Sequence, residues 1–247
     1  MAGTRETTSG NSEAALANRV ALVTGGSRGI GRAIAVLLAS MGAPVAICGR
    51  DAKALESAAS ELRKSSSRVF AQTADVTKPV EIDSLISKAE AALGPISILV
   101  NNAGIGLFGS AHEKSEEDWD RVLNTNLKSA FLVSKAVIPS MIRQGRGDII
   151  NVSSLVGRNT FAGGGLYCAS KWGLQGLSGC MAEDLRDHGI RVSVVCPGSV
   201  ATEFSSRPKD VSKALQPEDV AHAVAMLVTQ GAQSFVSEVQ MRPLRKP

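Results

Sequence analysis

The chain has few aromatic residues and few cysteines for its length. Aromatic side chains make up only 4% of the 247 residues, with a single tyrosine, so aliphatic residues and alanine must supply the core packing. The cysteines lack the paired spacing of a metal site or of a disulfide framework. We therefore expect reduced thiols, no bound metal and a cytoplasmic protein. These cysteines are Cys48, Cys168, Cys180 and Cys196.

Long apolar runs and an excess of one charge are also missing. No apolar run reaches the roughly 18 residues of a membrane-spanning helix, and the N-terminus lacks the features of a signal peptide. The 27 basic residues are scattered among 23 acidic ones, for a net charge of +4. This pattern predicts neither a membrane partner nor a nucleic-acid surface.

What the chain does have is a regular alternation of short apolar runs and helical stretches. We expect an α/β protein with a single-domain Rossmann fold over residues 19–247: a doubly wound, seven-stranded parallel sheet flanked by helices on both faces. Residues 1–18 are polar and predict a disordered extension. The expected strands cover 20–24, 44–48, 68–72, 96–100, 148–152, 191–196 and 234–241. The helical stretches cover the residues after Gly31 to about Met41, and 52–64, 78–92, 115–144, 166–187 and 216–229.

Three glycines follow the first expected strand, with the spacing G-x-x-x-G-x-G. Gly25 permits a tight turn, Gly29 a close approach to phosphate, and Gly31 close contact between helix and strand. A strand, a glycine turn and a helix form the context in which backbone N–H groups and the helix dipole hold a pyrophosphate. An ordinary turn seldom needs three glycines so placed, so the loop predicts nucleotide binding.

Arginine stands where an NAD site would have an acid. The second expected strand ends in Gly49 and Arg50, and Arg28 lies inside the glycine loop. A planar, permanently charged guanidinium suits the 2′-phosphate of NADP. Either arginine alone is compatible with a solvated surface residue, but the two together favour NADP(H).

Tyr167 and Lys171 are four residues apart and therefore share one helix face. An ammonium beside the phenol is expected to lower the tyrosine pKa and to give a general acid. A hydroxyl pair, Ser153 and Ser154, follows an apolar run upstream. Asn126 is a poor helix former in an apolar context, which indicates that something nearby binds its amide.

With these motifs in order, the chain resembles the short-chain dehydrogenases/reductases over residues 20–241. The resemblance implies hydride transfer between nicotinamide and a carbonyl or alcohol carbon. It implies Tyr167 as acid or base, Lys171 tuning it and holding the ribose, Ser154 bonding the substrate oxygen, and Asn126 holding a water. The implied cofactor-binding residues are Gly25, Ser27, Arg28, Gly29, Ile30, Gly31, Arg50, Asp75, Val76, Asn102, Ala103, Gly104, Tyr167, Lys171, Pro197, Gly198, Val200 and Thr202.

The resemblance leaves the substrate open. The C-terminal residues 236–243 lack the paired glycines of bacterial 3-oxoacyl-carrier-protein reductases and look more like a branch acting on small hydroxy acids and aldehydes. Reduction of a 3-oxoacyl group stays an alternative, as does a nucleotide-binding sensor without turnover. We expect residues 203–213 to form a loop that closes over substrate. Apolar residues such as Phe131, Val133 and Leu177 on two long helices predict a homodimer or homotetramer.

Overall fold

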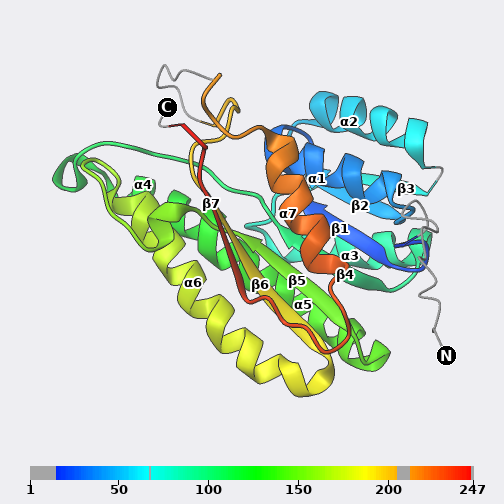
Figure 1. The fold of residues 1–247 in the computed structure, drawn as a ribbon. Helices are drawn as coiled ribbons and strands as arrows, with labels where there is room; N and C mark the ends of the chain where they lie inside the picture. Colours follow the sequence, from blue (N-terminus) through cyan, green and yellow to red (C-terminus); the bar gives the residue numbers. More distant parts are fainter. Residues whose placement is uncertain (1–14, 67, 205–211, 246–247) are drawn as a thin grey trace.

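The chain folds around one parallel sheet of seven strands, shown in a computed structural model that describes residues 15–66, 68–204 and 212–245 (Figure 1). The strand order is β3-β2-β1-β4-β5-β6-β7, so the order reverses between β1 and β4. This is the position at which open α/β sheets bind ligands, outside the carboxyl ends of the strands. The strands are β1 (Val20–Thr24), β2 (Val45–Gly49), β3 (Val69–Thr73), β4 (Ile96–Asn101), β5 (Gly147–Val152), β6 (Ile190–Pro197) and β7 (Glu238–Met241).

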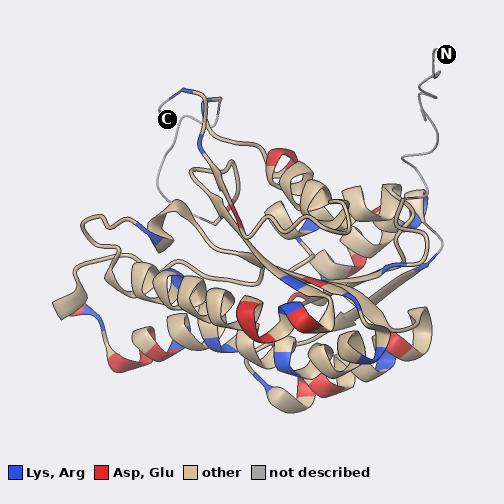
Figure 2. Ribbon diagram, turned by 60° about the horizontal axis from the view of Figure 1, so that its bottom comes forward, with Lys and Arg blue, Asp and Glu red and all other residues tan. Residues whose placement is uncertain are grey.

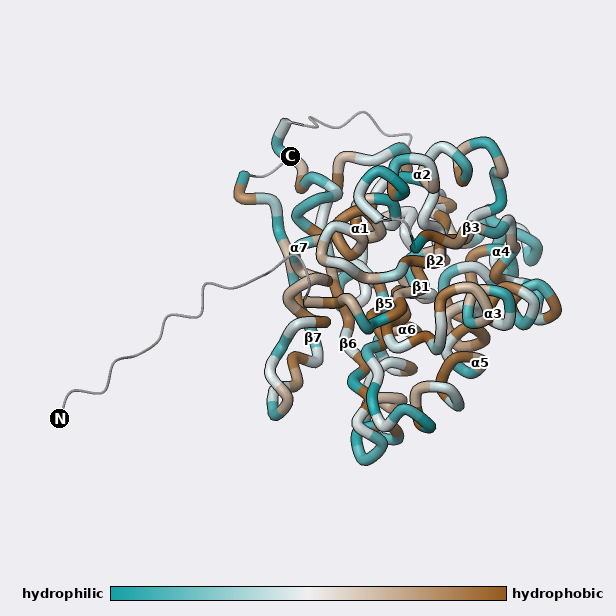
Figure 3. The backbone as a smooth tube through the Cα atoms, turned by 90° about the vertical axis from the view of Figure 1, so that its right-hand side faces the viewer, coloured by the Kyte–Doolittle hydropathy of each residue, from teal (hydrophilic) through white to brown (hydrophobic). Residues whose placement is uncertain are grey.

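Helices cover both faces of the sheet, as the alternating sequence predicts. One face carries α1 (Gly29–Ser40), α2 (Ala52–Ser65) and α7 (Pro217–Val228), and the other carries α3 (Pro79–Leu93), α5 (Ser129–Gln144) and α6 (Gly165–Leu185). Successive residues of a strand point to opposite faces of the sheet: Val23 packs with the layer that contains α1, and Leu22 packs with the layer that contains α3. Figure 3 shows the hydrophobic strands at the centre and hydrophilic turns outside. Burial of each such aliphatic side chain contributes about 1.5–3 kcal/mol.

The long helical stretch predicted at 115–144 is interrupted. It contains α4 (Glu116–Leu123), one π-helical turn (Asn124–Lys128) and α5. The Ser115 hydroxyl caps α4 by accepting a hydrogen bond from the Asp118 N–H at 3.1 Å. A π turn inserts an extra residue into the helix, which turns Asn126 inward toward the site described below.

Two predicted boundaries need correction. The last strand begins at Glu238 rather than at 234, although the Ser237 carbonyl already accepts the Val194 N–H at 2.9 Å. Residues 1–14 of the predicted extension lie outside the described residues. Leu16, however, is only 1% exposed, and its N–H bonds to the Met41 carbonyl at 3.1 Å. The ordered chain therefore includes Leu16, because this apolar side chain belongs to the core around α1 and α7.

The outer surface is mixed in charge and carries several exposed apolar side chains. Figure 2 shows basic and acidic residues interspersed along the helices. Of the three apolar residues predicted to face a partner, Phe131 is exposed, but Val133 is buried and Leu177 packs against the core, since the sheet-facing stripe is wider than expected. Trp119 and Trp172 are exposed as well. Within the described ranges, no helix could cross a membrane and no side-chain cluster suits a metal ion.

Candidate active site

The glycine loop lies between β1 and α1, at the point where the strand order reverses. Gly25 and Gly29 have φ values of +65° and +51°, which L side chains rarely adopt. A Cβ at Gly31 would lie 2.3 Å from the Gly25 carbonyl oxygen, so only glycine allows this contact between helix and turn. Gly31 therefore shapes the loop from inside, whereas Gly25, Ser27, Arg28, Gly29 and Ile30 line a cavity of about 880 Å³.

Asn102 connects the end of β4 to the glycine loop. Its amide donates to the carbonyl oxygens of Thr24 at 3.0 Å and Gly25 at 3.2 Å. In return, the Thr24 hydroxyl accepts the N–H groups of Asn102 and Ala103 at 3.0 and 3.1 Å. The two strand ends are thus tied together, and Asn102, Ala103 and Gly104 form one wall of the cavity.

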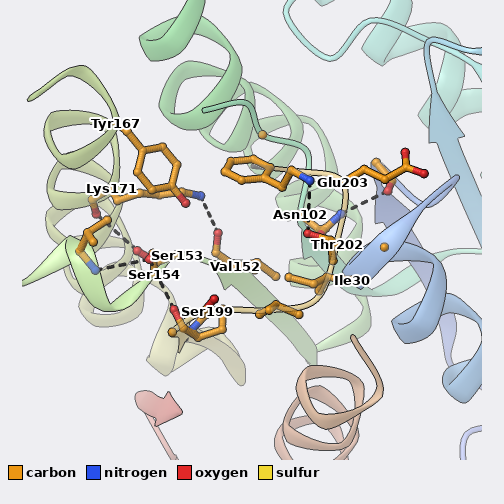
Figure 4. Close-up of a pocket in the computed structure, with 18 of the residues that line it drawn as sticks. Ile30, Asn102, Val152, Ser153, Ser154, Tyr167, Lys171, Ser199, Thr202 and Glu203 are labelled. Carbon is orange, nitrogen blue, oxygen red and sulfur yellow. Dashed lines mark hydrogen bonds between the residues drawn. The ribbon is translucent and has the colours of Figure 1, made fainter. Parts of the chain in front are cut away.

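Tyr167 and Lys171 project from the first turns of α6 into the same cavity (Figure 4). Lys171 is 5% exposed, and its ammonium donates to the Val152 carbonyl oxygen at 2.8 Å. The Lys171 Nζ lies 5.8 Å from the centroid of the Tyr167 ring. The sequence analysis predicted their common helix face, but the bond to Val152 depends on the tertiary structure.

The two candidate serines have different surroundings. The Ser153 hydroxyl is buried and donates to the Lys171 carbonyl at 3.5 Å, which ties the end of β5 to α6. The Ser154 hydroxyl lies beside Tyr167 and hydrogen-bonds to it. The structure thus brings together Ser154 and Tyr167, the pair that the sequence analysis selected.

The electrostatics of Tyr167 differ from the expectation. We expected Lys171 to lower its pKa, but burial raises the pKa of Tyr167 to about 12, although the Ser154 hydrogen bond opposes the rise. Burial also lowers the pKa of Lys171 to about 8. The physical reason is that desolvation disfavours the charged form of both groups, while the ammonium is bound to Val152. In this structure the phenol is therefore neutral at neutral pH.

Asn126 lies outside the set of residues that line the cavity. Its amide donates to the Ile105 carbonyl at 2.9 Å and to the Ser170 hydroxyl at 3.0 Å, and its oxygen accepts the Ile105 N–H at 2.8 Å. The expectation that something binds this amide is confirmed. The partners, Ile105 and Ser170, were not foreseen, and Ser170 directly precedes Lys171.

The two arginines predicted to bind a 2′-phosphate lie near the same edge of the sheet. Arg28 lines the cavity and forms an ion pair with Asp51, whereas Arg50 is exposed at the end of β2. Partial burial acts to raise the pKa of Asp75, but hydrogen bonds from Thr77 and the charge of Arg50 hold it below its usual value. Arg50 is thus close enough to act on Asp75, although Arg50, Asp75 and Val76 do not line the cavity itself.

The segment after β6 closes the cavity on its far side. Residues of this segment that line the cavity include Pro197, Gly198, Val200 and Thr202. The Gly198 N–H donates a hydrogen bond to the Met241 carbonyl oxygen of β7 at 2.8 Å. The sequence analysis missed Ser199. Its hydroxyl oxygen is buried and has no hydrogen-bond partner among the described residues. A serine after Pro-Gly carries no signal of its own in the sequence.

Tyr167 and three phenylalanines form one cluster of aromatic rings. The rings of Phe108 and Phe204 lie with centroids 5.6 and 5.7 Å from the Tyr167 ring, and Phe161 lies 5.9 Å from Phe108. Phe204 belongs to the 203–213 loop that the sequence analysis expected to close over substrate, whereas Phe108 and Phe161, which come from segments far apart in the chain, were missed. Residues 205–211 of that loop lie outside the described residues.

Comparisons with known proteins agree with this arrangement. The sequence model of the short chain dehydrogenase family matches residues 19–212. An uncharacterised oxidoreductase of Staphylococcus aureus strain MRSA252 is 33% identical over 231 residues, which cover 93% of this chain and 99% of the relative.

Solved structures are similar over most of the chain. A metagenomic short-chain oxidoreductase in complex with NADP is 42% identical, with a TM-score of 0.84 over 94% of this chain and 100% of that one. An alcohol dehydrogenase of the archaeon Thermococcus sibiricus, complexed with 5-hydroxy-NADP, is 32% identical, with a TM-score of 0.86 over 93% of this chain and 98% of that one.

Proposed function

The chain belongs to the short-chain dehydrogenase family and is an oxidoreductase, and from this premise we propose that it reduces a ketone or aldehyde to an alcohol, reversibly, with NADP(H). The observation that carries the proposal is one cavity that reaches from the glycine loop to Ser154, Tyr167 and Lys171. A nucleotide held at the first end and a carbonyl group at the second would share one enclosed space.

The residues present fit NADP(H). The glycine loop has the positive φ angles and the absence of side chains that close approach of a phosphate requires. Ser199, whose hydroxyl has no partner among the described residues, also lines the cavity. Arg28 and Arg50 would bind the 2′-phosphate. When bound, NADPH supplies a hydride, one hydrogen with two electrons, for the carbonyl carbon. The two solved relatives bound to NADP or its 5-hydroxy form support this assignment.

Tyr167 would supply the proton that completes the reduction. Because burial raises its pKa to about 12, the phenol carries its proton at neutral pH and can transfer it to the carbonyl oxygen. The Ser154 hydroxyl, which bonds to the phenol, would bond the same oxygen as negative charge develops on it. The carbonyl gains the hydride on carbon and the proton on oxygen, which gives the alcohol.

Lys171 and Asn126 would support Tyr167 in different ways. The ammonium of Lys171, bonded to Val152, stands where it can hold the ribose and later favour return of a proton to the phenolate. Both ends of the Asn126 amide are occupied by Ile105 and Ser170. These bonds support a role for Asn126 in positioning the turn of α6 that carries Ser170 and Lys171. The family resemblance implies a second role, in which Asn126 binds a water.

A panel of carbonyl compounds tests the proposal. Purified protein with NADPH should lose NADPH absorbance when a ketone or aldehyde is added, and should regain it with NADP and the corresponding alcohol. A 3-oxoacyl thioester in the panel tests the fatty-acid alternative. Tight binding of NADPH without turnover of any carbonyl compound would favour the sensor instead.

We also propose that copies of the chain associate as a homodimer or homotetramer. Trp119 on α4, Phe131 on α5 and Trp172 on α6 are large apolar side chains about half exposed in the single chain, and contact with another copy would remove them from water. Sedimentation at micromolar concentration should show a dimer or a larger species. A monomer alone would contradict this assignment.

A further inference from the structure

Aromatic residues are scarce in this chain and concentrated at one place. The chain contains two tryptophans, one tyrosine and six phenylalanines, and four of these nine residues line the cavity. Phe108 follows β4, Phe161 follows β5 and Phe204 follows β6. Three separate loops therefore each bring one phenyl ring to the cavity: Phe108 and Phe204 contact Tyr167, and Phe161 contacts Phe108.

The rings pack closely against two glycines. A Cβ at Gly106 would lie 2.7 Å from the Phe108 ring and 3.0 Å from the Phe204 ring. A Cβ at Gly164 would lie 2.5 Å from the Phe161 ring. Because side chains at these positions would displace the rings, the sequence and the fold together fix where the rings lie.

A backbone hydrogen bond also joins two of the loops. The Gly109 N–H donates to the Gly163 carbonyl at 2.9 Å, next to Phe108 on one loop and close to Phe161 on the other. Both glycines have positive φ values, +140° and +78°. The spacing of the two phenyl rings, 5.9 Å between centroids at an angle of 52°, is thus held by the backbone.

We propose that Phe108, Phe161 and Phe204 form the wall that selects the substrate, and that the substrate is a neutral carbonyl compound with an aromatic ring on its carbonyl carbon. This inference rests on the proposed function. With the carbonyl oxygen at the Tyr167 hydroxyl, a ring bonded to that carbonyl lies among rings that already contact Tyr167. Tilted and edge-to-face contacts of this kind contribute about 0.5–1.5 kcal/mol beyond burial of area.

The charges around the cavity favour a neutral substrate over a carboxylate. Glu203 also lines the cavity, but its carboxylate points away from Tyr167 (Figure 4). Among the described residues that line it, the arginines Arg28 and Arg32 belong to the glycine-loop end, and the Lys171 ammonium is bonded to Val152. A carboxylate next to the carbonyl would therefore face apolar rings, with Lys171 the one cation at that end among the described lining residues, and an apolar surrounding disfavours a charge.

Matched substrates test the wall directly. We would measure kcat and KM with NADPH for acetophenone, for cyclohexyl methyl ketone and for pyruvate. The first two have similar size and differ in the π system, whereas pyruvate replaces the ring by a carboxylate. Acetophenone should have the lowest KM, about two- to tenfold below that of the cyclohexyl ketone, the ratio expected for one or two aromatic contacts.

Substitutions locate the preference in the three rings. Phe108→Leu, Phe161→Leu and Phe204→Leu should each raise the KM for acetophenone about two- to tenfold and leave the KM for the cyclohexyl ketone nearly unchanged. Gly106→Ala should have the same effect because it displaces two rings. Phe235→Leu is the matched control, since this phenylalanine is exposed and lies outside the described lining of the cavity. The ratio of the two KM values within one variant does not depend on the fraction of protein that folds.

Three outcomes would overturn the inference. A wild-type preference for pyruvate would show that the site selects carboxylates, and an equal KM for the two methyl ketones would show that the rings act only as apolar surface. Equal losses on both ketones in all three phenylalanine variants would assign the rings a purely structural role. In each case the proposed reductase function would stand. If no carbonyl compound consumed NADPH, the proposed function would fail, and this inference with it.

Discussion

The two edges of the sheet differ in where their charged and titratable side chains lie. At the amino ends of the strands, Asp148 is 2% exposed, and both its carboxylate oxygens are paired, with Arg19 at 2.5 Å and Arg191 at 2.9 Å. At the carboxyl ends, the Ser199 hydroxyl has no partner among the described residues, and Tyr167 and Lys171 have strongly shifted pKa values.

The difference shows what each edge does. The two arginines at the amino edge also bond to carbonyl oxygens: Arg19 to Val228 at 2.7 Å and Arg191 to Ser234 at 3.0 Å. This cluster ties strands β5 and β6 to the segments on either side of them, and both oxygens of Asp148 form ion pairs within it. At the carboxyl edge, Ser154, Tyr167 and Lys171 line a cavity. Polar groups paired with each other stabilise the fold, whereas those left open to a cavity can bind and react.

The largest effect is expected from Tyr167→Phe. This change removes only the hydroxyl, so the ring contacts with Phe108 and Phe204 remain. Because general acid catalysis contributes about 10²–10⁴ in rate, kcat should fall by at least about a hundredfold, while NADPH binding and thermal stability persist. Steady-state kinetics with a responsive ketone and NADPH titration measure both. Near-normal turnover would remove Tyr167 from the chemistry and make the two edges functionally alike.

Asp148→Asn should do the opposite, with a loss of stability and no loss of chemistry. The change leaves two largely buried arginines without their carboxylate, and breaking such a pair costs about 3 kcal/mol. Denaturant unfolding should show this decrease, while kcat per folded molecule stays at the wild-type value. Glu183→Ala is the control, since its pair with Arg186 is exposed and should contribute little. Equal stability of the two variants would contradict the assigned role of the cluster.

The sequence predicts the fold and the shared helix face of Tyr167 and Lys171 because both follow from local patterns. Short apolar runs give the strands, and a spacing of four gives the face. The cluster around Asp148 joins residues 129 positions apart, so no local pattern contains it. The expected direction of the Tyr167 pKa shift was wrong for a related reason. The shift depends on burial of the phenol by Phe108 and Phe204 and on the hydrogen bond of Lys171 to Val152, and these are tertiary contacts.

A titration of Tyr167 sharpens the comparison at the carboxyl edge. Burial disfavours the phenolate, so the pKa lies above its usual value, at about 12. Tyr167 is the only tyrosine, so the difference in phenolate absorbance between the wild type and Tyr167→Phe reports it alone. Without cofactor, the phenol should stay almost entirely neutral at pH 10.5, where a tyrosine with a pKa near 10 is mostly ionised. A midpoint below 10 would restore the expectation that Lys171 controls the phenol.

Arg50→Asp tests whether Arg50 binds the 2′-phosphate of NADPH at the carboxyl edge of the sheet. Loss of a charge-assisted contact to a 2′-phosphate should weaken NADPH binding by about 1.5–3 kcal/mol, roughly ten- to over a hundredfold, and leave NADH binding unchanged or improved. Dissociation constants for both cofactors measure this preference. Arg63→Asp is the control, because Arg63 is exposed on α2 and pairs with Glu56 at 2.7 Å. An unchanged preference in Arg50→Asp would place the phosphate elsewhere.

The smallest effect is expected from Asp51→Asn, and its sign is informative. Asp51 accepts the Ala54 N–H at 3.1 Å as the cap of α2 and also pairs with Arg28. The cap hydrogen bond, followed by the charge of Arg28, holds the Asp51 pKa below its usual value. Asparagine caps a helix about as well, so the change mainly removes a negative charge that competes with a phosphate for Arg28.

NADPH should therefore bind to Asp51→Asn a few-fold more tightly than to the wild type, since exposed ion pairs are weak. The gain should shrink at high salt, where surface charges are screened, and it should vanish in an Arg28→Ala background. Dissociation constants for the single and double variants at low and high salt measure all three effects. Weaker NADPH binding in Asp51→Asn would mean that Asp51 orients Arg28 for the phosphate rather than competing for it. The Arg28–Asp51 ion pair would then be structural, like the ion pairs of Asp148, although it lies at the carboxyl edge, where we propose that the cofactor binds.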